Sequence, residues 1–236
     1  MTTRISKLTQ LAAALLTALA LTACGGGSDS ATPAGNGGPP LVVDADGNST
    51  FDTTTQGTQL AALPTETLSA TEQSSLTYMR EEEKLAGDVY TRLNAAWGLK
   101  VFANVATSES THTEAVRQLL LRYKVTDPAA NLGAGVYANP ELQALYTQLV
   151  AKGSTSVIEG LQVAVAIEEL DMLDINNHLK TVDNQDIRLV YDNLLKGSRN
   201  HLRSFHKNLL QQGGSYTAQY LTQAEFDAIA NSPMEK

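Results

Sequence analysis

Through most of the chain after residue 69, hydrophobic residues recur every three or four positions, which is the spacing of helices with one buried face. Ser69-Ala70-Thr71-Glu72 forms a capping box that predicts a helix start, and Gly98 predicts the end of the same helix. Similar signals predict four long and two short helices, over residues 69–97, 101–123, 154–180 and 183–211, from Asn139-Pro140 to Gly153, and after Thr222. We therefore expect an all-α fold.

The connections between the long helices differ in length. The first and second helices, like the third and fourth, are separated by only about three residues, so the helices of each pair must be antiparallel. A much longer stretch that includes a short helix joins the second long helix to the third. The order short, long, short predicts a ferritin-like four-helix bundle with a long crossover between its second and third helices.

The N-terminus has the pattern of a secretory signal. Basic residues precede an apolar run at residues 8–20, which is too short to span a membrane as a helix. The run ends in Leu21-Thr22-Ala23-Cys24, which resembles the lipobox of bacterial lipoproteins. We expect residues 1–23 to be a signal peptide and Cys24 to carry a lipid, such as palmitate, that anchors the protein in the cell envelope. Because Gly25 rather than an aspartate follows the cysteine, the outer membrane is favoured if the organism has one. The open alternative is an ordinary signal peptide.

Residues 24–68 differ in composition from the rest of the chain. They contain eight of the 17 glycines and four of the seven prolines, and neither lysine nor arginine. Such a stretch buries too little apolar surface to offset the entropy lost on ordering, so we expect a flexible tether. The folded domain is then expected to comprise residues 69–236.

Charge and cysteine content exclude several classes of protein. The formal net charge is -8, and no basic block is present, so nucleic acid is not an expected partner. The single cysteine excludes an internal disulfide framework, a cysteine-based zinc site and an iron–sulfur cluster. Any metal must therefore be held by carboxylates and histidines.

Each predicted long helix interrupts its apolar face near the middle with a carboxylate, a histidine or both. These inward-facing residues are Glu83 in the first helix, Glu109 and His112 in the second, Glu168 and Asp171 in the third, and His201 in the fourth. Several buried carboxylates in one core require a compensating cation. A glutamate and a histidine three positions apart share a helix face and can reach one ion. The pattern predicts a metal site of the dinuclear carboxylate type.

The fourth helix departs from this pattern. Ser198 stands where a glutamate partner of His201 is expected, and Asp171 or Glu169 is the candidate to supply the missing carboxylate. Without such a replacement, the site would hold a single ion. The alternative is a metal-free network in which the two histidines pair with Glu109 and Glu168, helped by Arg199 or Arg203.

Other polar residues are assigned to the surroundings of the site. We place Ser198, Tyr90 and Arg199 around the ligands and expect Tyr90 to serve packing rather than redox chemistry. The remaining candidates are expected to be solvated or to lie outside the ligand set: Glu81, Glu82, Glu169, His178 and His206.

Motifs in all four predicted long helices carry a family resemblance. They are Met79-Arg80-Glu81-Glu82-Glu83-Lys84-Leu85-Ala86, Ser108-Glu109 with His112, Ile167-Glu168-Glu169-Leu170-Asp171 and Gly197-Ser198-Arg199-Asn200-His201-Leu202-Arg203. Together they resemble the bacterial and archaeal family called domain of unknown function 2202. The resemblance implies a ferritin-like fold and leaves the activity unassigned. More distantly, Glu83, Ala86 and Tyr90, followed by Glu109 and His112, are similar to the first half of a rubrerythrin diiron site.

Two classes of function remain open. The first is a non-haem diiron or dimanganese oxidoreductase of the envelope that acts on O2, peroxide or ferrous iron. Its electron donor would be external, because this chain lacks the four-cysteine iron domain that rubrerythrins usually carry. The second is a non-enzymatic envelope lipoprotein, either a passive metal binder or an interaction domain. Both are compatible with a homo-oligomer.

Overall fold

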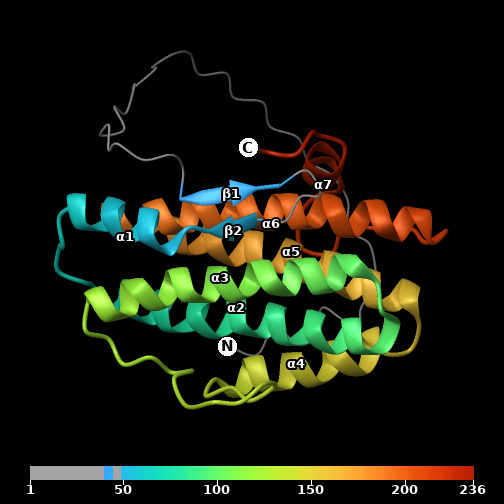
Figure 1. Cartoon of the computed structure of the whole chain (residues 1–236), viewed down its shortest axis with the longest axis horizontal. Coiled ribbons are helices and arrows are strands. Elements are labelled where there is room, and N and C mark those ends of the chain that lie inside the picture. The colour runs from blue at the N-terminus through green and yellow to red at the C-terminus, as the bar shows by residue number, and fades with distance from the viewer. Residues whose placement is uncertain (1–39, 45–48) are drawn as a thin grey trace, which may run out of the picture. The chain divides into compact units, whose positions relative to one another are not determined.

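Four long helices make up most of the computed structural model, which describes residues 40–44 and 49–236 (Figure 1). The long helices are α2 (Ala70–Trp97), α3 (Lys100–Arg122), α5 (Val157–Leu179) and α6 (Gln185–Gln211). The shorter elements are β1 (Leu41–Val43), β2 (Ser49–Phe51), α1 (Thr53–Ala62), α4 (Pro140–Gly153) and α7 (Gln223–Ala230).

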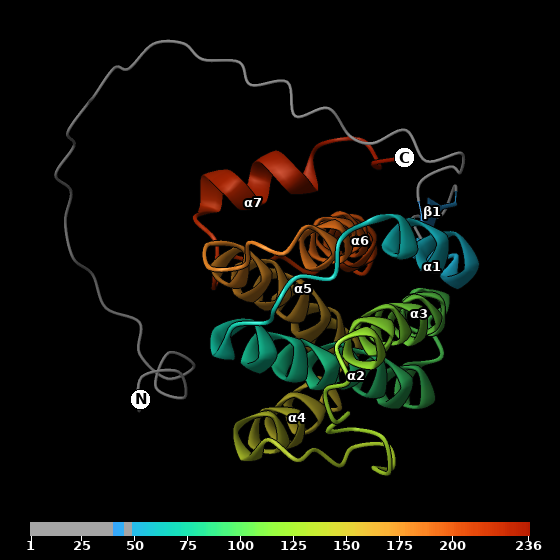
Figure 2. The ribbon, with the colours of Figure 1, turned by 90° about the vertical axis from the view of Figure 1, so that its left-hand side faces the viewer.

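The long helices form the all-α bundle that the hydrophobic pattern predicts. α2 packs most extensively on α3, and α5 on α6, while α2 also contacts α5 and α3 also contacts α6. The long connection between α3 and α5 contains α4, which packs against α2 and α5, and α7 lies against α6 (Figure 2). The expected crossover between the second and third long helices is therefore present.

Capping side chains fix where the helices begin. The Ser69 hydroxyl accepts from the Glu72 amide, and the Glu72 carboxylate accepts from the Ser69 amide, so the predicted capping box is complete. The same carboxylate also accepts from the amides of Asp183 and Asn184, just before α6. Gly98 ends α2 with φ of 64°, in the left-handed region that favours glycine. The cap of α2 thus also links the start of that helix to the start of α6.

Aromatic and aliphatic side chains fill the space between the helices. Tyr90 packs on Phe205 with ring centroids 4.8 Å apart, and Phe102 packs on the same ring at 5.7 Å. The Trp97 indole donates to the Gly153 carbonyl with an Nε1–O distance of 2.9 Å, which attaches the end of α2 to the end of α4. These contacts pack the helices closely around the polar residues near the middle of the bundle.

The segment before α2 is folded rather than a tether along its whole length. β1 and β2 pair antiparallel, with Leu41 opposite Phe51 and Val43 opposite Ser49. β2 packs against α3 and α6, and α1 packs against α3. Leu41, Phe51 and Leu60 are buried in the same core as the bundle. The prediction of a tether through residue 68 was therefore wrong for residues 41–43 and 49–62.

Local pattern outweighs average composition in this segment. The two strands are rich in residues that favour β-structure, with Val42 and Val43 in β1 and Thr50 and Phe51 in β2. Asp52 caps α1 by accepting from the amides of Thr54 and Thr55. Counting glycines and prolines over 24–68 averages these signals away.

The predicted signal peptide and Cys24 lie outside the described residues. Among the helices of the described part, none combines the length and the apolar character needed to cross a membrane.

Candidate metal centre

Five of the predicted site residues meet in the interior of the bundle, one or two from each long helix. They are Glu83 on α2, Glu109 and His112 on α3, Glu168 on α5 and His201 on α6. All five are buried almost completely. The inward seams of the helices therefore converge as the sequence pattern predicts.

Glu109 lies between the two histidines. Its Oε2 is 2.9 Å from His112 Nδ1, and its Oε1 is 2.8 Å from His201 Nδ1. The imidazole rings stack, with centroids 5.1 Å apart and planes inclined by 17°. One carboxylate from α3 thus faces the same ring nitrogen of histidines on two helices.

The other two glutamates lie at opposite ends of this arrangement. Glu83 Oε2 is 3.4 Å from His112 Nδ1, and Glu168 Oε2 is 3.6 Å from His201 Nδ1. The Tyr90 hydroxyl donates to Glu168 Oε1 at 2.6 Å. Each histidine Nδ1 is therefore near two carboxylates from different helices, and Tyr90 orients one of them.

Most of these polar atoms are close together without being hydrogen-bonded. Among the described residues, no partner of acceptable hydrogen-bond geometry exists for either Nδ1, for either oxygen of Glu109, or for Glu83 Oε1 and Glu168 Oε2. Buried polar atoms are almost always satisfied in folded proteins. Ligand atoms of Glu109, His112 and His201 form a compact group: they lie within 4.8 Å of one another and could hold a metal ion. Unsatisfied atoms directed at a common space fit a cation there.

Burial and neighbouring charges set the protonation of the cluster. Burial raises the pKa of Glu83 to about 7. For Glu109, burial acts in the same direction, but His112 and His201 outweigh it and hold its pKa below the usual range. For the histidines, burial lowers the pKa, but the carboxylates, Glu109 first, outweigh it and raise it to about 10 for His112 and about 9 for His201. Both imidazoles are thus protonated at neutral pH without an ion, and a cation must displace those protons.

Asp171 is buried beside the cluster rather than within its compact group of ligand atoms. Burial raises the pKa of Asp171 well above its usual value, and Glu82 and Glu168 add to the effect. Its role as the replacement carboxylate stays a prediction. Among the described residues, no arginine or lysine forms an ion pair with Glu83, Glu109 or Glu168. In the described part of the chain, the ion-pair partners of these three glutamates are therefore the two histidines.

Three glutamates expected to be solvated or outside the ligand set are all buried, and none joins the compact group. Glu81 accepts from the backbone amides of Ala138 and Asn139. Glu169 accepts from the Tyr216 hydroxyl and from the amide of Gln219. Of the two alternatives, burial excludes solvation for these glutamates and leaves a place outside the ligand set, because α2 and α5 are covered on several sides by the bundle and its connections.

Glu82 is the third of these buried acids. The Tyr78 hydroxyl lies 3.2 Å from its Oε1 and 3.1 Å from Asp174 Oδ2, so one proton is shared between the two carboxyl groups. Burial, followed by Asp174, raises the pKa of Glu82 well above its usual value. Glu82 therefore adds a further carboxylate to the acidic surroundings of Glu83.

Neither arginine proposed to help the histidines reaches the cluster. Arg199 forms a two-pronged ion pair with Glu235, and Arg203 binds Glu235 and Ser232. The assignment of Arg199 to the surroundings of the ligands was therefore wrong. The Arg199 side chain lies on the face of α6 that contacts the C-terminal segment. The sequence pattern gave no sign that this segment packs against α6.

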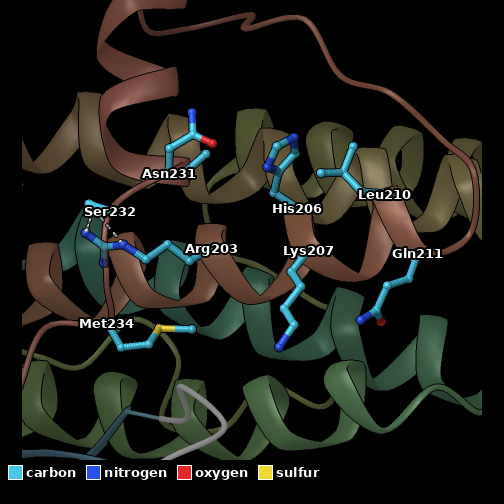
Figure 3. A pocket seen from close by; sticks show the side chains of 9 residues that line it. Arg203, His206, Lys207, Leu210, Gln211, Asn231, Ser232 and Met234 are labelled. Carbon is cyan, nitrogen blue, oxygen red and sulfur yellow. Dashed lines mark hydrogen bonds between the residues drawn. The ribbon is translucent and has the colours of Figure 1, made fainter.

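A surface cavity of about 510 Å³ lies next to these arginine contacts, between α6 and the segment that follows α7 (Figure 3). Figure 3 shows the Arg203 side chain held by Ser232 at one end of the cavity. His206, one of its lining residues, is half-buried and packs edge-on against Phe226. The cavity contains none of the candidate metal ligands, so it is separate from the buried cluster.

Two residues at the site were missed by the sequence analysis. Ser49 on β2 is fully buried, and its hydroxyl lies 3.2 Å from His112 Nε2 and 2.6 Å from His201 Nε2. Gly197 on α6 lies so close to His112 that an added Cβ would be only 2.5 Å from His112 Cε1. The isolated glycine inside a helix pattern was the available clue to Gly197, and the β-favouring residues around Ser49 were the clue to its strand. Ser198, by contrast, donates to the Leu194 carbonyl of its own helix.

Comparisons with known proteins agree on one relationship. Residues 72–233 match the family model described as "Uncharacterized protein domain (DUF2202)". The chain is 44% identical over 177 residues to the uncharacterized protein MJ0754 of Methanocaldococcus jannaschii, covering 75% of this chain and 96% of that protein. It also resembles the crystal structure of the hypothetical protein MJ0754 from Methanococcus jannaschii, with a TM-score of 0.72, 45% identity, and coverage of 73% of this chain and 99% of that one. None of these names assigns a function.

Proposed function

The chain belongs to the uncharacterised DUF2202 family, and we propose that it is a ferritin-like metalloprotein of the cell envelope with a non-haem diiron or dimanganese centre. The observation that carries this proposal is the group of buried, unsatisfied atoms of Glu109, His112 and His201, which lie close enough together to hold a metal ion, with Glu83 and Glu168 beside them. A core with this many carboxylates and two histidines is stabilised by a cation that neutralises it.

The donor set fits iron or manganese. Carboxylates are hard ligands and imidazoles are borderline, a combination suited to both metals. Glu83, Glu109, His112, Glu168 and His201 would hold the ions, with Asp171 as the additional carboxylate in place of the glutamate absent at Ser198. Glu109 faces both histidines, and this position supports its assignment as a central ligand.

The reaction class that we propose is oxidation or peroxide chemistry. Bound iron or manganese would supply the redox change and the coordination positions for O2, peroxide or ferrous iron. The chain itself contributes a site buried away from bulk solvent and fixes Glu168 through the Tyr90 hydroxyl. Electrons would come from an external donor.

Metal reconstitution tests the proposal directly. Protein is loaded anaerobically with ferrous iron or manganese, metal is quantified, and the iron form is then exposed to air and followed by optical spectroscopy. We expect about one to two ions per chain. Glu109→Ala combined with His112→Ala should abolish binding, whereas Glu114→Ala, on the same helix but paired with Arg117 outside the cluster, should not. Wild-type protein that takes up neither metal would refute the proposal.

A metal-free network is the second candidate, because Glu109 already lies within 2.9 Å of both histidines. In that case the cluster serves register and stability only, and wild-type protein would remain metal-free while the double variant unfolds more easily. Metal uptake without turnover of peroxide or ferrous iron would instead identify a passive binder.

We also propose lipid anchoring at Cys24, on the sequence alone. Expression in a bacterium with a lipoprotein pathway, followed by labelling with a palmitate analogue and membrane fractionation, tests it. Wild-type protein should be labelled and sediment with membranes. Cys24→Ser should be unlabelled, and labelling of that variant would contradict the assignment.

A further inference from the structure

A residue outside the family-matched region completes the surroundings of the two histidines. The match to the family model begins at residue 72, whereas Ser49 belongs to the hairpin that precedes it. The Ser49 hydroxyl lies 2.6 Å from His201 Nε2 and 3.2 Å from His112 Nε2. It therefore contacts the ring nitrogens that face away from Glu109.

The chemistry of a hydroxyl matches this position. A histidine that binds an ion through Nδ1 carries its proton on Nε2, which then donates a hydrogen bond. A serine oxygen has two lone pairs and can accept from two such donors at once. One hydroxyl between His112 and His201 thus holds both rings in the tautomer that leaves each Nδ1 free to bind a metal.

Backbone contacts hold Ser49 in place. Its amide donates to the Ser108 hydroxyl at 3.1 Å, and the Phe51 amide donates to the Thr111 hydroxyl at 2.9 Å. Both acceptors lie on α3, next to Glu109 and His112. The Phe51 ring also packs edge-on against His112, with centroids 5.4 Å apart. The strand is therefore attached to the helix that carries two of the candidate ligands.

Gly197 on α6 also lies close to Ser49 and His112. A Cβ at Gly197 would lie 3.0 Å from the Ser49 oxygen and 2.9 Å from His112 Nε2. Because Gly197 has no side chain, the Ser49 hydroxyl has room to contact both histidine rings. The position thus depends on three separate segments: the hairpin, α3 and α6.

We infer that Ser49 is a positioning residue of the metal centre, which orients both histidine ligands through their Nε2 atoms. This inference rests on the proposed metal-binding function. The hairpin, which precedes the family-matched part, then contributes a residue to a centre whose candidate ligands all lie within that part.

Metal affinity of Ser49→Ala tests the inference. Manganese is titrated into wild-type protein and the variant in competition with a chelator, and cobalt is used as an optical probe of the ligand geometry. Removing an outer hydrogen-bond partner of a metal-bound histidine lowers metal affinity by about 10–100-fold, so we expect that loss and an altered cobalt spectrum. Thr50→Val is the matched control, since neighbouring side chains of a strand point to opposite faces. It should bind like wild type.

A second measurement reads the hydrogen bonds without metal. Two-bond nitrogen–proton spectra of the histidine rings in the metal-free protein report the state of each Nε2, and Ser49→Ala should shift the Nε2 signals of His112 and His201. If wild-type protein binds metal and Ser49→Ala shows the same metal affinity and the same ring signals, the role of Ser49 is refuted and the metal centre is not. A wild type that binds no metal would remove both.

Discussion

Gly197 lies in the middle of α6, where glycine is normally destabilising. An added methyl group at this position would meet the His112 ring at 2.5 Å and the Ser49 oxygen at 3.0 Å. The gain in helix propensity is therefore opposed by a clash with two groups of the centre. Local helix preference and the needs of the site conflict here, and the site determines the residue.

Gly197→Ala should consequently destabilise the protein by about 1–3 kcal/mol, the usual cost of overpacking a core, and weaken metal binding by displacing His112. Urea unfolding and manganese titration measure the two effects. Gly57→Ala is the control, because Gly57 lies in α1 with open space around its Cα. That variant should gain roughly 0.5–1 kcal/mol from helix propensity. Equal behaviour of the two variants would show that the close approach at Gly197 has no consequence.

Tyr90→Phe isolates one hydrogen bond of the centre. The hydroxyl donates to Glu168 at 2.6 Å in a fully buried environment, and the ring packs on Phe205. Phenylalanine keeps the packing and removes the donor. We expect a loss of about 1–3 kcal/mol in unfolding free energy, because a buried carboxylate oxygen loses its partner. Calorimetry of the metal-free protein measures it, and an unchanged midpoint would show that Glu168 needs no donor.

At the scale of single residues, the sequence predicted those that lie on the inward face of a long helix, because helix periodicity defines that face. Glu109 and His112 share a face at a spacing of three, so their proximity follows from helix geometry alone. Ser49 and Arg199 depend on segments far away in the chain, the hairpin in one case and Glu235 in the other. No periodicity records such partners, which is why one residue was missed and the other was misassigned.

At the scale of elements, the helices after residue 69 were predictable because their hydrophobic spacing repeats over several turns and specific side chains cap their ends. The reciprocal Ser69–Glu72 bonds fix the start of α2, and those between Thr222 and Glu225 fix the start of α7. β1 and β2 have three residues each, too few for a period to register. Their stability comes from packing on α3 and α6 rather than from local preference.

Phe51→Ala distinguishes a folded hairpin from a tether. Phe51 is only 5% exposed and packs on His112, so its truncation should cost about 3–5 kcal/mol, as for other buried phenylalanines. Val42 is 55% exposed on the partner strand, and Val42→Ala should change the stability little. Urea unfolding, with limited proteolysis before α2, measures both. If residues 41–51 acted as a tether, both variants would match wild type.

At the scale of the whole molecule, the C-terminal segment is attached to α6 by charge. Arg199 and Arg203 both bind Glu235, whose amide donates to Asn200 at 2.9 Å. Hydrogen bonding to Arg199 first, then to Arg203, lowers the pKa of Glu235 to about 2 against the opposing effect of burial. The end of the chain is thereby held against the outer face of the helix that carries His201.

The pH dependence of this contact has a definite sign. Because folding lowers the Glu235 pKa, its contribution is complete above the pKa of the unfolded chain, near 4.5, and is lost as the pH falls through the folded value of about 2. Glu235→Gln should therefore be less stable than wild type near neutral pH, and the difference should shrink from about pH 4.5 downward. Urea unfolding of both proteins across this range measures it. A difference that stays constant down to about pH 3 would contradict the ion-pair account.

The candidate ligands come from all four long helices, so an ion between them would connect the whole bundle at its centre. A ligand that binds only the folded state stabilises it by about 2.7 kcal/mol at a concentration one hundred times its dissociation constant. Adding manganese to the metal-free protein should therefore raise the melting temperature, and a chelator should reverse the rise. Glu109→Ala with His112→Ala removes two ligand side chains from the compact group, and its melting temperature should no longer respond. An equal rise in that double variant would place the bound manganese elsewhere on this acidic protein.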